Sequence, residues 1–144
     1  MSSEKSGTIT GKGSSSKAYN NGDKWVVDVS GGQIFFSNSP ENISDIIVDT
    51  NLSLSSYYQK PLYIVSDNNL IGNEIALSLE KYVSRVQNAC YGNCTSNYPE
   101  KDCKDNLIVY NSTKEKRVYQ KENCVFINGD LRALDAFLYK IFGV

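Results

Sequence analysis

Apolar residues gather in short runs along most of the chain, and the earliest of these runs predict β-strands. Two of them, at 24–29 and 33–37, flank Gly31-Gly32. A glycine-containing turn between two apolar runs is typical of a β-hairpin. A further run at 62–66 is rich in Ile, Val and Tyr and predicts a strand buried on both faces.

The spacing of apolar residues changes from strand-like to helical after residue 70. Intervals of three and four residues then predict an amphipathic helix over 72–87. A second apolar stripe predicts a helix over 131–142, which Asp130 is placed to cap and Gly143 to end.

The segments between the helices predict three more strands, "NLIVYN", "RVYQ" and "NCVFINGD", with "RVYQ" as an antiparallel return. Strands followed directly by helices favour the α/β class. We expect a single mixed sheet with a parallel segment, two main amphipathic helices, an N-terminal β-hairpin and a disulfide-stapled loop. Residues 1–23 are mostly Ser, Gly, Lys and Asn and predict a flexible arm, so 24–144 is expected to form one domain.

The stretch from "PLYIVSDNNLIGNEIA" to "NCVFINGDLRALDAFLYKIFGV" resembles an α/β domain of archaeal S-layer and related cell-envelope proteins. The likeness lies in "NLIVYN", "NCVFINGD" and the terminal helix. The chain departs from the family where Asn128-Gly129-Asp130 replaces a "GGP" that often follows such a strand. The resemblance implies an extracytoplasmic, membrane-anchored envelope protein without known catalytic activity, and it carries over no functional residues.

Charge and composition exclude several classes of function. Fifteen basic and sixteen acidic residues leave a net charge of -1, which argues against nucleic acid as a partner. The apolar runs fall well short of the roughly 20 residues of a membrane span, and the N-terminus lacks the apolar core of a signal peptide. An exported form would therefore need a leader or anchor beyond this sequence. The chain has no His, which removes the usual catalytic base and metal ligand, and we expect no catalysis, cofactor or metal.

Four cysteines form the pattern C-x3-C-x8-C-x20-C, at Cys90, Cys94, Cys103 and Cys124. Zinc sites usually present two short Cys pairs, and a redox motif opens a helix, so neither fits well. Two disulfides in an exported protein fit better than reduced thiols. The pairing stays open among three patterns. We favour 103–124 with 90–94 because Cys103 and Cys124 each precede a predicted strand, although 90–103 with 94–124 is nearly as good.

Two further groups of residues are candidates for function. N-glycosylation motifs begin at Asn42, Asn51, Asn93 and Asn111, all in predicted loops or at strand ends, while chance alone supplies roughly two such motifs. If strands 62–66 and 124–128 are parallel, their ends form a ligand edge with Ser66, Asp67, Asn128 and Asp130. The same residue types are also what helix caps and turns require. Two carboxylates are too few for Ca²⁺.

Taken together, these features predict a non-catalytic structural or adhesive domain of a cell envelope, located outside the cell or at its surface. Its partners would be other envelope proteins or a second copy, with membrane contact only through an anchor. The alternatives are a small ligand-binding module or minor enzyme at the Asp67/Asp130 edge, and a filament subunit in which "GTITG" adds a strand to its neighbour.

Overall fold

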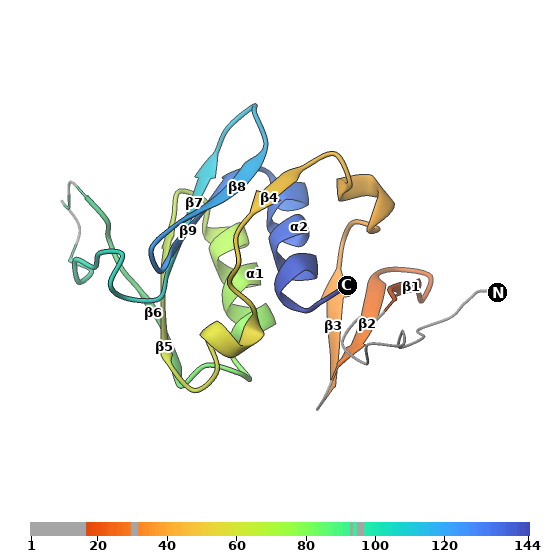
Figure 1. The fold of residues 1–144 in the computed structure, drawn as a ribbon, viewed down its shortest axis with the longest axis horizontal. Helices are drawn as coiled ribbons and strands as arrows, with labels where there is room; N and C mark the ends of the chain where they lie inside the picture. The colour runs from red at the N-terminus through yellow and green to blue at the C-terminus, as the bar shows by residue number, and fades with distance from the viewer. Residues whose placement is uncertain (1–16, 30–31, 93, 95–96) are drawn as a thin grey trace.

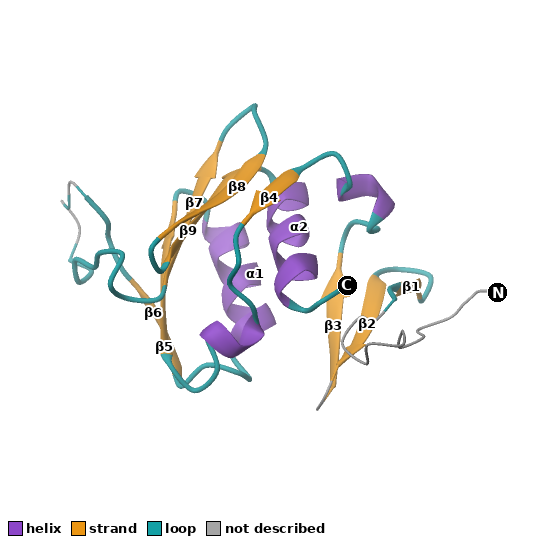
Figure 2. Ribbon diagram, in the orientation of Figure 1, coloured by secondary structure: helices purple, strands orange, loops and turns teal. Residues whose placement is uncertain are grey.

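The computed structural model describes residues 17–29, 32–92, 94 and 97–144. Two helices lie between a six-stranded sheet and a three-stranded sheet, as Figures 1 and 2 show. One buried apolar cluster includes residues from both sheets and from both helices. The α/β class predicted from the sequence is therefore confirmed.

The larger sheet is mixed, as predicted. Its strand order is β4 (Ile47–Asp49), β8 (Arg117–Lys121), β9 (Cys124–Gly129), β7 (Leu107–Ser112), β5 (Pro61–Ser66) and β6 (Arg85–Asn88). The last four strands are parallel, whereas β8 is antiparallel to β9, and β4 is parallel to β8. The return strand β8 thus pairs with β9 and not with β7. β9 is buried along almost its whole length and takes the place beside β7, while the partly exposed β8 is displaced outward.

Helix α1 (Asn69–Leu79) begins and ends earlier than the range 72–87 predicted from the sequence. It begins earlier because the Asn68 side chain accepts a hydrogen bond from the Ile71 amide at 3.1 Å and caps the first turn. It ends earlier because the chain turns back beside β5, where the Ser84 amide donates to the Lys60 carbonyl. The following residues then form β6, parallel to β5.

Helix α2 (Leu131–Ile141) matches its predicted range closely. Asp130 caps it, accepting a hydrogen bond from the Arg132 amide at 2.9 Å. Gly143 follows its end with a φ of +76°, a left-handed conformation that glycine adopts without strain. Because α2 lies between the two sheets, most of its residues are buried.

The predicted hairpin consists of β2 (Trp25–Val29) and β3 (Gly32–Phe36), which pair antiparallel. Its turn, including Gly31, lies outside the described residues. A third strand, β1 (Tyr19–Asn20), pairs with β2 and lies within the segment predicted as a flexible arm. The sequence could not show β1, because two residues carry no periodicity. Residues 1–16 of that arm, which include "GTITG", lie outside the described residues.

The three-stranded sheet is attached to α2 by aromatic stacking and by a buried carboxylate. The rings of Phe36 and Tyr139 stack with their centroids 4.0 Å apart. The Asp135 carboxylate is 4% exposed and accepts hydrogen bonds from the Asn38 backbone amide at 3.0 Å and from its side-chain amide at 2.9 Å. Burial raises the pKa of Asp135 from 3.8 to about 6, the Asn38 bonds oppose that rise, and the charge of Glu74 adds to it.

The described part of the segment between β6 and β7, residues 89–92, 94 and 97–106, lies on the face of the large sheet that the helices leave open. We call this segment the cysteine loop; Figure 1 shows it on the side of the sheet away from α1 and α2. A second buried cluster forms beneath it, comprising Tyr63, Ala89, Cys103, Leu107, Val109, Cys124 and Phe126. Tyr91 packs onto this cluster with its ring centroid 5.6 Å from that of Phe126. The central strands β5, β7 and β9 are therefore buried on both faces along most of their length.

Among the helices of the described residues, none combines the length and the apolar character needed to cross a membrane.

Replacing Asp135 by Asn is expected to remove a pH dependence of stability. Because the pKa of Asp135 is raised from 3.8 to about 6, the folded protein keeps a proton that the unfolded chain releases. The stability from this proton is fully present below about pH 4 and is lost as the pH rises through about 6, with a total of roughly 3 kcal/mol. Urea unfolding measured from about pH 4 to pH 7.5 should show the free energy of unfolding fall with rising pH in the parent protein. The same fall should be absent from D135N.

The exposed Asp23 provides the matched control, because Asp23→Asn changes the same charge on a turn outside the core. D23N should keep the slope of the parent protein. An equal slope in D135N would contradict the assignment of the raised pKa to Asp135.

Candidate functional site

The predicted ligand edge lies at the carboxyl ends of β5, β7 and β9, with β7 between the two carboxylates. The Asp67 carboxylate accepts hydrogen bonds from the Ser112 backbone amide at 2.9 Å and from the Ser112 hydroxyl at 3.0 Å. Asp67 thus ties the turn after β5 to the end of β7. The Ser66 hydroxyl donates to the Asn68 carbonyl at 2.7 Å within the same turn.

Asp130 and Asn128 are also engaged. Besides capping α2, the Asp130 carboxylate lies 3.7 Å from the Lys116 ammonium. The Asn128 side-chain oxygen accepts a long hydrogen bond of 3.5 Å from Asn111. All four residues of the predicted edge therefore make internal contacts, and those of Ser66, Asp67 and Asp130 are of the kind that caps and turns require.

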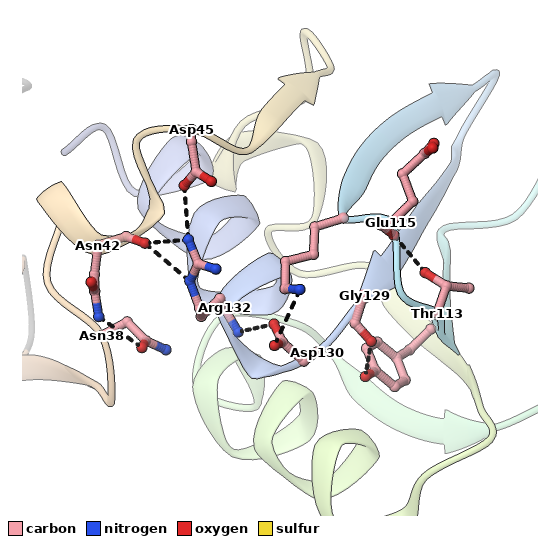
Figure 3. Close-up of polar contacts among 10 residues, drawn as sticks. Asn38, Asn42, Asp45, Thr113, Glu115, Gly129, Asp130 and Arg132 are labelled. Atoms are coloured by element: carbon pink, nitrogen blue, oxygen red, sulfur yellow. Dashed lines mark hydrogen bonds and ion pairs between the residues drawn. The ribbon is translucent and has the colours of Figure 1, made fainter.

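Arg132 extends this network to the connection between β3 and β4. Its guanidinium donates to the Asn42 carbonyl at 2.6 and 3.0 Å and to the Asp45 carboxylate at 2.8 Å (Figure 3). The result is a braced surface around the start of α2, in which the charged groups already have partners.

A crevice opens on the opposite side of β5 from β7, at the carboxyl ends of β5 and β6. Its volume is about 560 Å³, and its polar lining includes Ser66, Asn69, Asn73, Asn88 and Tyr98. The lining also contains Gly72 of α1, where an added Cβ would lie 3.3 Å from the Ser66 Cβ. Glycine at this position allows the helix to approach the strand end closely.

The topology explains why the crevice forms at this point. β5 continues into α1 on one face of the sheet, whereas β6 continues into the cysteine loop on the other face. Where the connections of two adjacent parallel strands leave on opposite faces, their carboxyl ends are left uncovered, and ligands of open α/β sheets bind there. The crevice could not be predicted without β6, which lies within the range predicted from the sequence as a helix.

A smaller cavity of about 240 Å³ lies between β3 and the two helices. Its lining includes Asp135, Glu74, Leu77 and Phe35. The Asp135 carboxylate is already bound by Asn38, so this cavity belongs to the attachment of the small sheet. The sequence signal for this attachment, which was not among the predicted sites, is a carboxylate within the apolar face of α2.

The cysteines form two disulfides, Cys90–Cys94 and Cys103–Cys124, which is the pairing favoured from the sequence. Their Cα atoms are 5.7 and 4.8 Å apart. In the part of the chain that the structure describes, every cysteine is bonded, and no group of His, Cys, Asp or Glu side chains is arranged to hold a metal ion.

Three of the four glycosylation motifs lie among the described residues. Asn42, Asn51 and Asn111 are all exposed, on the 3₁₀ turn Glu41–Ile43, after β4 and near the end of β7. Asn93 lies outside the described residues. The exposed positions leave space for a glycan in solvent.

Comparison with models of protein families, with curated proteins and with solved structures finds no match to this chain. The contacts within the structure are then what distinguishes the Asp67/Asp130 edge from the crevice between β5 and β6. The Asp67/Asp130 edge is engaged internally, whereas the crevice between β5 and β6 is open and polar.

Replacing Asp130 by Ala is expected to lower the free energy of unfolding by about 1 kcal/mol, because the first turn of α2 loses its cap. Asp130→Ser retains a capping oxygen and should stay close to the parent protein. Urea unfolding followed by circular dichroism measures both variants. Equal stability of D130A and the parent protein would show that the cap contributes nothing.

Proposed function

We propose that this chain is an extracytoplasmic, non-catalytic domain with a structural or adhesive role in a cell envelope. The observation that supports the proposal is the disulfide Cys103–Cys124, whose residues are 5% and 0% exposed. It joins the cysteine loop to the central strand β9 inside the second buried cluster. Stable disulfides of this kind occur in proteins that fold in oxidising compartments.

The position of this disulfide gives it a structural task. The cysteine loop contributes few apolar side chains to the second cluster, chiefly Ala89, Tyr91 and Cys103. Such a segment buries too little apolar surface to offset its loss of conformational entropy. The covalent link restricts the unfolded chain and keeps the loop over the sheet, contributing about 3 kcal/mol for a separation of 21 residues.

The finer features of the proposal come from the sequence. The exposed motifs at Asn42, Asn51 and Asn111 would carry glycans, and the resemblance to archaeal S-layer domains supports an envelope location. The full-length protein would then be anchored to the membrane, with other envelope proteins or a second copy as partners. The absence of His from the sequence supports a role other than acid–base catalysis.

The disulfides provide the test. Protein secreted into the periplasm of an expression host should contain no thiol that alkylates before reduction, and reduction should raise its mass by about 4 Da, one hydrogen for each sulfur. The variant with Cys103 and Cys124 replaced by Ala should lose about 3 kcal/mol of stability. The variant with Cys90 and Cys94 replaced should lose about 2 kcal/mol, because it opens a shorter loop.

Each of the two variants serves as a control for the other, because each removes one disulfide and two sulfur atoms. A difference in their stability therefore reports the position and loop length of the disulfide. Four alkylatable thiols in the secreted protein would contradict the extracytoplasmic proposal. So would full stability of the reduced protein, because the second face of the sheet would then need no oxidised link.

A further inference from the structure

The crevice between β5 and β6 is lined by amide side chains to which the described residues offer no hydrogen-bond partner. The structure records no hydrogen bond between the side-chain amides of Asn69, Asn73 or Asn88 and any other described residue. Asn69 and Asn73 are four positions apart on α1 and so lie on one face of the helix. Asn88 is at the end of β6, in register with Ile64 of β5. Two elements therefore bring three amides to one concave surface.

The lining restricts the chemistry of a ligand. Each amide offers two donor hydrogens and an acceptor oxygen on adjacent atoms. No Asp, Glu, Lys or Arg is among the described residues that line the crevice. An anion would find no cationic side chain there, and a metal ion would find no carboxylate. The group that matches adjacent donors and acceptors is the hydroxyl, which itself donates and accepts.

Tyr98 adds an aromatic surface at the rim. Its side chain is 53% exposed, and it comes from the cysteine loop. The neighbouring backbone is held against the end of β6, because the Cys90 amide donates to the Pro99 carbonyl and the Lys101 amide donates to the Cys90 carbonyl, both at 2.9 Å. A half-exposed ring beside polar groups offers an apolar face to a ligand that has both hydroxyls and C–H surfaces.

We propose that this crevice is a binding site for a neutral saccharide. The sugar hydroxyls bond to Asn69, Asn73 and Asn88, and a C–H face of the sugar ring packs on Tyr98. The volume of about 560 Å³ lies within the range of ligand pockets, about 300–1,000 Å³. The inference goes beyond the proposed envelope role and does not depend on it, because the crevice is defined by β5, β6 and α1.

The test is a titration of the oxidised full chain, labelled with ¹⁵N, with glucose, galactose, mannose and N-acetylglucosamine. At least one sugar should shift the side-chain amide signals of the three Asn residues with a saturable Kd on the order of 1 mM. Asn73→Ala should weaken that Kd by about tenfold or more. Ala is a good helix former at this exposed position of α1, so N73A should fold normally.

Asn51→Ala is the matched control, because it removes an exposed amide that does not line the crevice and should leave the affinity unchanged. Tyr98→Ala should also weaken binding, because the sugar ring loses the aromatic face on which it packs. The proposal is overturned if no sugar shifts the three amides at about 50 mM. It is equally overturned if inorganic phosphate or Ca²⁺ shifts them in place of the sugars, or if N73A binds as the parent protein does.

Discussion

The structure depends on one constraint. Its central parallel strands are apolar on both faces of the sheet, but helices cover only one of these two faces. Ile108 of β7 faces the helices, while Leu107 and Val109 face the other side. In most parallel sheets a second layer of helices buries that other side. Here the cysteine loop takes that place, and the disulfide to Cys124 of β9 holds it there. A loop rich in polar residues can act as a layer because the link removes much of its freedom before folding.

The same arrangement determines where the molecule has an open polar surface. At the ends of β5, β7 and β9 the connections are tied together by the bonds of Asp67 to Ser112 and by the ion pair of Asp130 with Lys116, so these side chains are engaged in the fold. Between β5 and β6 the connections diverge to opposite faces, and the strand ends remain open. The cysteine loop that closes the second face also carries Tyr98 to the rim of this crevice. Stability and the candidate binding surface thus share one segment.

The three-stranded sheet adds a layer on the far side of the helices and accounts for the most perturbed carboxylate among the described residues. α2 would be an ordinary amphipathic helix if only the large sheet covered it. Because the small sheet packs on its other side, Asp135 is enclosed and bonds to Asn38, and Tyr139 stacks on Phe36. A carboxylate at this position costs free energy through desolvation, and its two hydrogen bonds recover part of that cost while fixing the chain that leaves β3.

The sequence by itself determined the α/β class, the hairpin, the strands around "PLYIVS" and "NCVFIN", and α2 with its cap at Asp130. These features depend on periodicity and on local capping, which neighbouring residues specify. The sequence favoured the observed disulfide pairing but left 90–103 with 94–124 nearly as good. The tertiary structure decided between them, because β7 and β9, which follow Cys103 and begin at Cys124, are neighbours in the sheet. Only the tertiary structure decided the end of α1, the strand β6 and the place of β9 between β7 and β8. Each depends on which distant strand supplies the hydrogen bonds, and a short run such as "RVQN" fits either a helix or a strand until that partner is present.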